Sequence, residues 1–174
     1  MRKVYTERSR SGFTLIELLM SMAIIGVLST FGYIAYNGAQ VKARDAERKS
    51  DLRQISEALE LYFADYDRYP DSENGNILGC PLPAGACTWG SGEFSDGSTT
   101  YFKALPQDSR SSAGFSYYYR VHGTSNQKYQ IFARLENQND KDCINGNCVD
   151  PVSYQCGSAF CNFAITSSNT TPLE

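Results

Sequence analysis

The six cysteines are the residues of this chain whose number and placement most directly imply chemistry. An even set of cysteines in a loop-rich region outside the cytoplasm indicates disulfides. Zinc is the competing interpretation, because the last four could form a four-cysteine site, but their gaps lie at the wide edge of the usual ligand spacing. We therefore expect disulfides and no metal, with the full connectivity left open. The cysteines are Cys80, Cys87, Cys143, Cys148, Cys156 and Cys161.

One cysteine pair can be argued from local geometry. Between Cys143 and Cys148 stands the dipeptide Asn145-Gly146, which is the preferred two-residue turn of a β-hairpin. If Ile144 and Asn147 form the hydrogen-bonded pair that closes the turn, the two cysteines face each other at the next cross-strand pair of the hairpin. Their Cα atoms would then be ~4.5 Å apart. That separation lies within the reach of a disulfide. The sequence predicts a Cys143–Cys148 bridge across a hairpin.

A polar segment near these cysteines offers oxygen ligands of the kind that calcium prefers. Their spacing is not that of an EF-hand, and a solvated polar loop is the favoured interpretation. Calcium binding stays open. The ligand candidates are Asn137, Asn139, Asp140, Asp142 and Asp150.

An enzyme is not predicted. His122 is the only histidine, and it falls in a predicted turn, where an exposed structural role is expected. The chain contains no Gly-x-Ser-x-Gly, no His-Glu-x-x-His and no phosphate-cradling glycine loop. We expect no catalytic residue and no cofactor.

Charge is distributed unevenly along the chain. The first 12 residues hold four of the 16 basic residues and one of the 19 acidic residues. Removing them leaves 12 basic and 18 acidic residues, a formal net charge of -6. A protein of that sign is not attracted to phosphate backbones in general, so broad nucleic-acid binding is not expected.

A membrane-spanning segment follows the basic leader. Phe13 to Tyr36 is apolar except for a few hydroxyl side chains and one charge, Glu17. About 20 apolar helical residues cross a bilayer, whereas the apolar part of a cleavable secretory signal is shorter. Basic residues ahead of the span hold the N-terminus in the cytoplasm. We expect a single pass through the inner membrane, with everything after about residue 40 outside.

The residues around Glu17 carry a specific resemblance. The stretch from Ser11 to Leu19, SGFTLIELL, resembles the class III signal of type IV prepilins and of type II secretion pseudopilins. In that signal a short basic leader ends in glycine, and an aromatic residue, an apolar stretch and a glutamate follow. An isolated carboxylate at membrane depth costs about 3 kcal/mol on insertion scales, so Glu17 needs a partner or access to headgroups.

The resemblance implies roles for three residues. Gly12 would end the leader, and a prepilin peptidase and methyltransferase would cut between Gly12 and Phe13 and methylate the new amine of Phe13. Glu17 would pair with that amine on a neighbouring subunit. Two physical arguments agree: an ammonium partner offsets the cost of a carboxylate in an apolar filament core, and an acid in the first helical turn faces the positive end of the helix dipole.

The span is expected to continue as an amphipathic helix over residues 37–69. Apolar residues recur there mostly at three- and four-residue spacing, with charged residues on the other faces, including Asp45 and Arg48. The helix should stop near Tyr69-Pro70. The apolar positions are Ala39, Ala43, Ala46, Leu52, Ile55, Ala58, Leu59, Tyr62, Phe63 and Tyr66.

The rest of the chain predicts a small antiparallel sheet. Residues 70–105 are expected to form an irregular connection, because the stretch from 71 to 100 is rich in Gly, Ser, Pro and Asp. Strand patterns at 115–121 and 129–135, joined by a polar turn at 122–127, predict a hairpin, and a further strand is expected near 160–166. We predict an α+β fold in which one apolar sheet face packs on the helix. The expected domains are 1–12 leader, 13–36 membrane or filament-core helix, 37–69 helix extension, 70–105 connection, and 106–174 sheet domain.

A looser resemblance extends beyond the signal. The stretch from Leu105 to Glu136 is similar to the C-terminal domain of pilins and major pseudopilins. Taken together, the resemblances imply a homopolymeric type IV pilus-like filament for adhesion, motility or DNA uptake. The subunit would reside in membrane lipid before an inner-membrane assembly platform builds it into an extracellular filament.

Two other functions stay open. The nearest is a major pseudopilin of a type II secretion system, and the cysteine-rich tail after Glu136 favours the pilus over it. The other is a signal-anchored binding module or enzyme, which would not be cut after Gly12.

Overall fold

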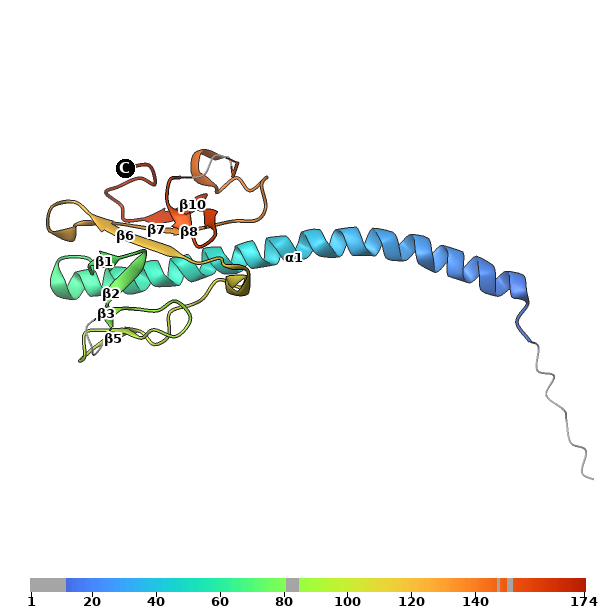
Figure 1. The fold of residues 1–174 in the computed structure, drawn as a ribbon, viewed down its shortest axis with the longest axis horizontal. Helices are drawn as coiled ribbons and strands as arrows, with labels where there is room; N and C mark the ends of the chain where they lie inside the picture. The colour runs from blue at the N-terminus through green and yellow to red at the C-terminus, as the bar shows by residue number, and fades with distance from the viewer. Residues whose placement is uncertain (1–11, 81–84, 147, 150–151) are drawn as a thin grey trace, which may run out of the picture. The chain divides into compact units, whose positions relative to one another are not determined.

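The computed structural model describes residues 12–80, 85–146, 148–149 and 152–174. The chain divides into two units, residues up to Gln40 and Val41–Glu174, which we describe separately. Helix α1, Leu15–Tyr66, contributes to both (Figure 1). All described strands are short, antiparallel and in the second unit, so the predicted α+β class with a long N-terminal helix is confirmed.

The described part of the first unit is helical from Leu15 onward, after three residues without regular secondary structure. Every side chain described between residues 12 and 40 is exposed, including the large apolar ones. A Cβ atom added at Gly26, Gly32 or Gly38 would meet nothing within 4 Å. A mostly apolar helix without a covering layer is typical of a segment that lies in lipid or against other copies.

In the second unit, one stripe of α1 is buried. It comprises Asp45, Arg48, Leu52, Ile55 and Leu59, at alternating spacings of three and four residues. The expected pattern was wrong at the start of this stripe, because Ala43 and Ala46 are exposed while Asp45 and Arg48 face inward. The charges can be buried because each has a partner of opposite sign.

The helix ends three residues before the predicted Tyr69-Pro70 stop. Tyr66 is its last residue, and Asp67 adopts φ of 53° while donating its N–H to the carbonyl of Phe63 at 2.8 Å. A left-handed residue with this hydrogen bond is a common way to close a helix.

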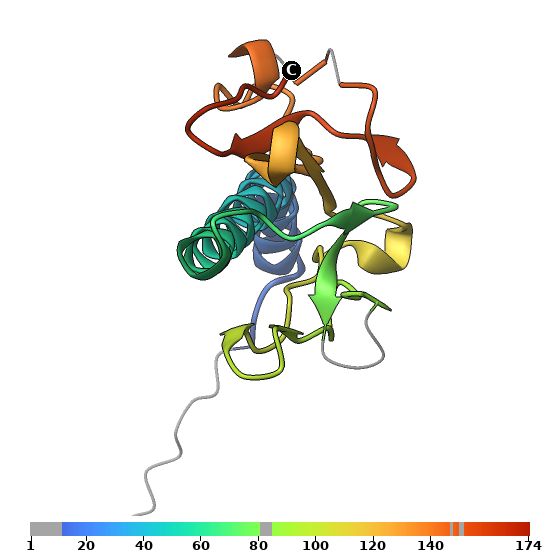
Figure 2. The same ribbon diagram turned by 90° about the vertical axis from the view of Figure 1, so that its left-hand side faces the viewer.

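The main sheet has the strand order β10-β7-β6. Its strands are β6 Tyr118–His122, β7 Lys128–Ala133 and β10 Phe163–Thr166. The β6–β7 hairpin turns through the short 3-10 helix η2, Thr124–Asn126. This turn lies where the polar residues of the sequence predicted it. Figure 2 looks along α1, with this sheet on one side of the helix and the segment containing β1–β3 on another.

Both faces of this sheet are covered in its centre, which the sequence pattern missed. Tyr129, Ile131 and Ala133 of β7 join the core with the helix, as expected. Phe132 points the other way and packs with Ile144 and the Cys156–Cys161 disulfide beneath the C-terminal region. A second, smaller core therefore holds the tail on the outer face of the sheet.

The segment over residues 71–100 is more ordered than the predicted irregular connection. It contains a three-stranded sheet of β1 Ser72–Glu73, β2 Asn76–Cys80 and β3 Gly85–Ala86. A two-stranded pair follows, β4 Phe94–Ser95 with β5 Thr100–Phe102. Ile77 and Phe94 are fully buried and, with the Cys80–Cys87 disulfide, fix a segment whose composition alone predicts a loop.

Arg48 is the charged centre of the second unit and is completely buried. Its Nε and Nη2 donate to Asp108 at 2.8 and 3.0 Å, and its Nη1 donates to Asp45 at 2.7 Å and to Glu136 at 2.8 Å. Asp45 also accepts the backbone N–H groups of Glu136 and Asn137. One guanidinium thus joins α1 to the loop before η1, Ser111–Ala113, and to the chain leaving β7.

Glu136 is held charged by three arginines. Hydrogen bonds from Arg44, and then from Arg48 and Arg110, outweigh the effect of burial and lower the pKa of Glu136 to about 2. Arg44 and Arg110 are partly exposed, whereas Arg48 is not.

We predict that Asp108→Asn lowers the free energy of unfolding by about 3 kcal/mol, because it leaves the buried guanidinium short of an anionic partner. Urea unfolding of the full chain in detergent, followed by tryptophan fluorescence, measures this. The matched control is Arg110→Gln, which removes a half-exposed member of the same network and should cost about 1 kcal/mol or less. Equal losses from the two variants would contradict a central role for Arg48.

Acid should weaken the fold through Glu136. Its pKa in the folded state lies below the ordinary value of 4.5, so its stabilisation is complete above that value and is lost as the pH falls toward about 2. The loss should be about 3 kcal/mol across that window. Unfolding curves of wild type and Glu136→Gln from pH 6 down measure it. The difference between the two proteins should shrink with acid, and a constant difference would contradict the assignment.

Candidate assembly site and disulfide framework

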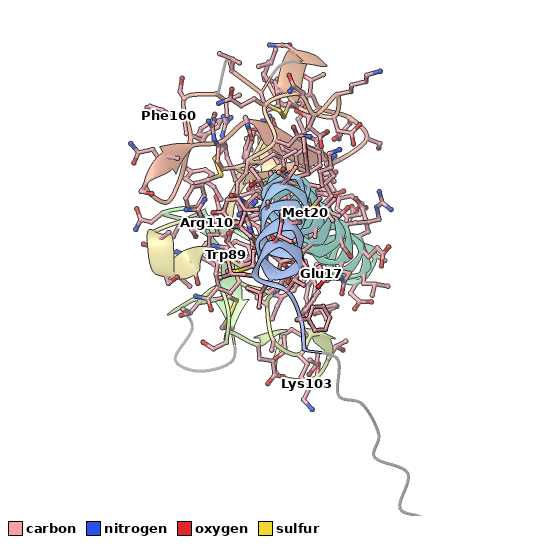
Figure 3. All side chains as sticks on the ribbon, turned by 90° about the vertical axis from the view of Figure 1, so that its right-hand side faces the viewer. Glu17, Met20, Trp89, Lys103, Arg110 and Phe160 are labelled. Carbon is pink, nitrogen blue, oxygen red and sulfur yellow. A yellow bond between two sulfur atoms is a disulfide. The ribbon has the colours of Figure 1, made fainter. Side chains whose placement is uncertain are left out.

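Glu17 lies in the first turn of α1 (Figure 3), where it forms a capping box with Thr14. Its Oε2 accepts the backbone N–H of Thr14 at 2.9 Å and the Thr14 hydroxyl at 2.7 Å. The Thr14 Oγ1 in turn accepts the N–H of Glu17 at 3.4 Å. Thr-x-x-Glu ahead of an apolar stretch is the sequence signature of this motif, so the cap could have been found from the sequence.

The capping box occupies only one oxygen of the carboxylate. No residue within the described chain donates a hydrogen bond to Oε1 of Glu17. The helix start is thus stabilised within the subunit, while one carboxylate oxygen stays available to a donor from outside it.

Gly12 and Phe13 precede the helix and are fully accessible. Gly12 has no regular secondary structure, and Phe13 has 87% of its surface exposed. The rest of the leader lies outside the described residues. A peptide bond in non-helical, exposed backbone is a geometry that a peptidase cleft accommodates.

Helix α1 is the one helix within the described residues that is long and apolar enough to cross a membrane. The exposed residues of its apolar part include Leu15, Leu18, Met22 and Phe31. An apolar surface of this extent is stable in lipid or against other subunits, which indicates a membrane-anchored protein.

The structure contains three disulfides, Cys80–Cys87, Cys143–Cys148 and Cys156–Cys161. It joins Cys143 to Cys148, the pair singled out from the sequence, with Cα atoms 5.1 Å apart. The hairpin argument for that pair was wrong. Ile144–Gly146 forms the 3-10 helix η3, in which Asn145 and Gly146 have positive φ, and Asn147 lies outside the described residues.

A hairpin does occur at the last cysteine pair. Strands β8, Gln155–Cys156, and β9, Ala159–Phe160, pair on either side of Gly157, and Cys161 follows directly. Both cysteines of this pair are fully buried against Phe132.

The oxygen-rich loop uses its carboxylates inside the protein. Asp140 and Asp142 each accept a hydrogen bond from Lys49 at 2.7 Å. The Asn137 side chain accepts the N–H of Asn139. Among the described residues no group of three or more His, Cys, Asp or Glu side chains could hold a metal ion, and Asp150 lies outside them.

His122 lies at the end of β6, half-buried. Burial, and then the nearby Arg120, lower its pKa below the ordinary value. Its Nε2 lies 3.4 Å from the hydroxyl of Thr170, in a contact between β6 and the C-terminal tail. This placement fits a structural role.

Comparison with known proteins identifies the family. Residues 8–33 match the prokaryotic N-terminal methylation motif, and residues 35–142 match the profile of type II secretion system (T2SS), protein G. The chain belongs to the type II secretion system protein G family. This is a family of structural pilin-like subunits, not enzymes.

The relatives include both secretion and pilus proteins. The type II secretion system core protein G of Aeromonas hydrophila is 34% identical over 102 residues, covering 59% of this chain and 68% of that relative. Its counterpart from Klebsiella pneumoniae is 33% identical over 97 residues, or 56% and 66%. The type IV major pilin protein PilA of Myxococcus xanthus is 36% identical over 90 residues, covering 47% of this chain and 40% of that pilin.

The balance of these relatives corrects one expectation. The cysteine-rich tail favoured a pilus subunit, but the matching family and most of the relatives are secretion proteins, so the secretion alternative fits better. No solved structure matches the chain.

Proposed function

We propose that this chain is the major pseudopilin-like subunit of a type II secretion system. Its helix polymerises with other copies into a short filament, and assembly of that filament drives release of exported proteins. The observation that carries the proposal is the family match over residues 35–142, joined to an apolar helix whose first turn presents one carboxylate.

The first turn of the helix supports a specific assembly contact. Glu17 carries the only charge from Phe13 to Tyr36, and its Oε1 lacks a donor within the described chain. Cleavage before Phe13 creates an ammonium group four residues away in sequence. In a packed apolar filament the carboxylate loses access to headgroups, so the amine of Phe13 on a neighbouring subunit is the natural partner.

Processing and location follow from the same segment. A prepilin peptidase and methyltransferase cuts after Gly12 and methylates Phe13. Before assembly the subunit spans the inner membrane once, with its N-terminus inside, and an assembly platform moves it into the filament.

A pilus subunit is the second candidate. Two observations favour it: the similarity to PilA, and a tail carrying two disulfides beyond residue 142, where the protein G match ends. In that case the filament would be long and displayed at the cell surface.

We predict that the mature chain begins at Phe13. Intact-mass analysis of protein extracted from membranes should show loss of residues 1–12 and one added methyl group. Gly12→Val should accumulate as full-length precursor, because a β-branched residue does not fit a cleft built for glycine, while Gly12→Ala should be cut in part. A native N-terminus at Met1, or a cut elsewhere, would contradict the prepilin assignment.

We predict that deletion of this gene in its own organism blocks release of exported enzymes and that the wild-type gene restores it. Glu17→Gln should be inserted and cleaved normally yet fail to restore secretion, because it keeps the shape of Glu17 and removes the charge. Thr14→Val is the matched control, since it removes the capping hydroxyl and leaves the carboxylate.

The readouts are enzyme activity in the culture medium and cleaved subunit in the membrane fraction. Loss of surface filaments with normal secretion in the deletion strain would replace the pseudopilin by the pilus. Full secretion by the Glu17→Gln strain would contradict the assembly contact.

A further inference from the structure

Two adjoining cavities lie in the second unit, and no described residue of α1 lines either of them. One has a volume of 410 Å³ and the other 350 Å³. They share Asn76, Trp89 and Ser116 in their linings, so they form one groove with Trp89 at its centre. Each volume falls in the range of small-molecule sites, which run from about 300 to 1,000 Å³.

The groove is lined by side-chain amides without partners. Asn74, Asn76 and Gln155 line the first cavity, and Gln107 lines the second. No hydrogen bond joins any of these four amide groups to another described residue, in contrast to Arg48, whose guanidinium donates four. These four amides bond to no other described residue, and those of Asn74, Gln107 and Gln155 belong to exposed residues, so they offer donors and acceptors to a neutral ligand.

Trp89 gives the groove an aromatic surface held in place. Its indole N–H donates to the carbonyl of Gly75 at 3.3 Å, and its ring meets that of Tyr117 at 90°, with centroids 5.7 Å apart. The side chain is only partly buried. A fixed, half-exposed indole is a flat platform on which an apolar ligand face can stack.

The lining of the groove is nearly uncharged, and its apolar surface is aromatic. Asp108 is its one charged residue among those described, and Arg48 neutralises it. The described lining holds no aliphatic side chain, so its apolar surface is aromatic and comes from Trp89, Phe115, Tyr117 and Tyr118. An aromatic face combined with amides and hydroxyls suits a ligand that has one flat C–H face and many hydroxyl groups.

Two disulfides hold the walls of the groove. Trp89 stands two residues after Cys87, and Gln155 directly precedes Cys156. The second wall is docked tightly: Ser158 donates its N–H to the Gly114 carbonyl at 2.7 Å, and a Cβ on Gly157 would stand 1.9 Å from that oxygen. The groove is therefore preformed, which reduces the entropy lost on binding.

We propose that this groove binds neutral polysaccharide chains, with a pyranose ring stacked on Trp89 and its hydroxyl groups bonded by the surrounding amides. β-Linked glucose and N-acetylglucosamine chains present the flattest C–H faces and are the expected ligands. The site would give an exported filament a contact with cell-wall or matrix glycans.

Trp89 is the only tryptophan of the chain, so its fluorescence reports on this groove alone. The full chain is purified in a zwitterionic detergent without a sugar headgroup and titrated with cellohexaose or chitohexaose. We expect a saturable change in emission with a Kd on the order of 1 mM, as one stacked ring and a few hydrogen bonds provide.

Variants separate the groove from the rest of the surface. Gln155→Ala, an exposed position that should fold normally, and Asn76→Ala should each weaken binding at least about fivefold. Trp89→Ala should abolish binding in calorimetry. Lys103→Ala is the control, because this exposed residue lines neither cavity, lies apart from Trp89 (Figure 3) and should bind as wild type.

Several results would overturn the proposal. They are the absence of any emission change with both sugars, undiminished binding by Gln155→Ala and Asn76→Ala together, and equal or tighter binding of polygalacturonate. A stronger response to a neutral hexapeptide than to either sugar would assign the groove to a peptide instead.

Discussion

The buried guanidinium of Arg48 is the interaction on which the second unit depends. It is the point where the helix, the loop at Asp108 and the chain leaving β7 at Glu136 meet. A buried cation is costly unless it is paired and hydrogen-bonded, and here carboxylates of three segments accept four hydrogen bonds from the guanidinium. Apolar packing would tolerate small shifts between helix and sheet, whereas this hydrogen-bonded centre specifies one arrangement. Residues from Leu52 to Leu59 can then pack against β7 in a single register.

The apolar part of α1, in contrast, is not stabilised by contacts within the described chain. It has no covering layer within the described chain, so its stability depends on lipid or on other copies. Its one charge is partly satisfied by Thr14 and keeps an oxygen for an external donor. In the assembly we propose, such a subunit is stable in the bilayer as a monomer and gains a specific ionic contact only when it packs beside another copy.

Much of this architecture could be predicted from the sequence, and the failures have physical causes. The span, the helix extension and the β6–β7 hairpin follow from periodicity, because burial there is a property of one element. Asp45 and Arg48 were placed on the solvent face because their partners, Asp108 and Glu136, lie 60 or more residues away. The 71–100 segment looked like a loop because its order comes from a disulfide and from long-range packing of Phe94. The Thr14 cap could have been predicted from its Thr-x-x-Glu pattern. The Trp89 groove could not, because segments far apart in the sequence line it and no local pattern connects them.

The most direct test of the assembly account is the distance between two atoms in the filament. Subunits labelled with 15N-phenylalanine are mixed with subunits labelled with 13C at the glutamate side-chain carboxyl, and the mixture is polymerised for solid-state NMR. The account predicts dipolar coupling between the methylated amine nitrogen of Phe13 and a glutamate carboxyl carbon of a different subunit, about 3.5 Å apart. In the Glu17→Gln variant this coupling should be absent, either because the filaments lack the contact or because no filaments form. Filaments that form normally and show no such coupling would contradict it.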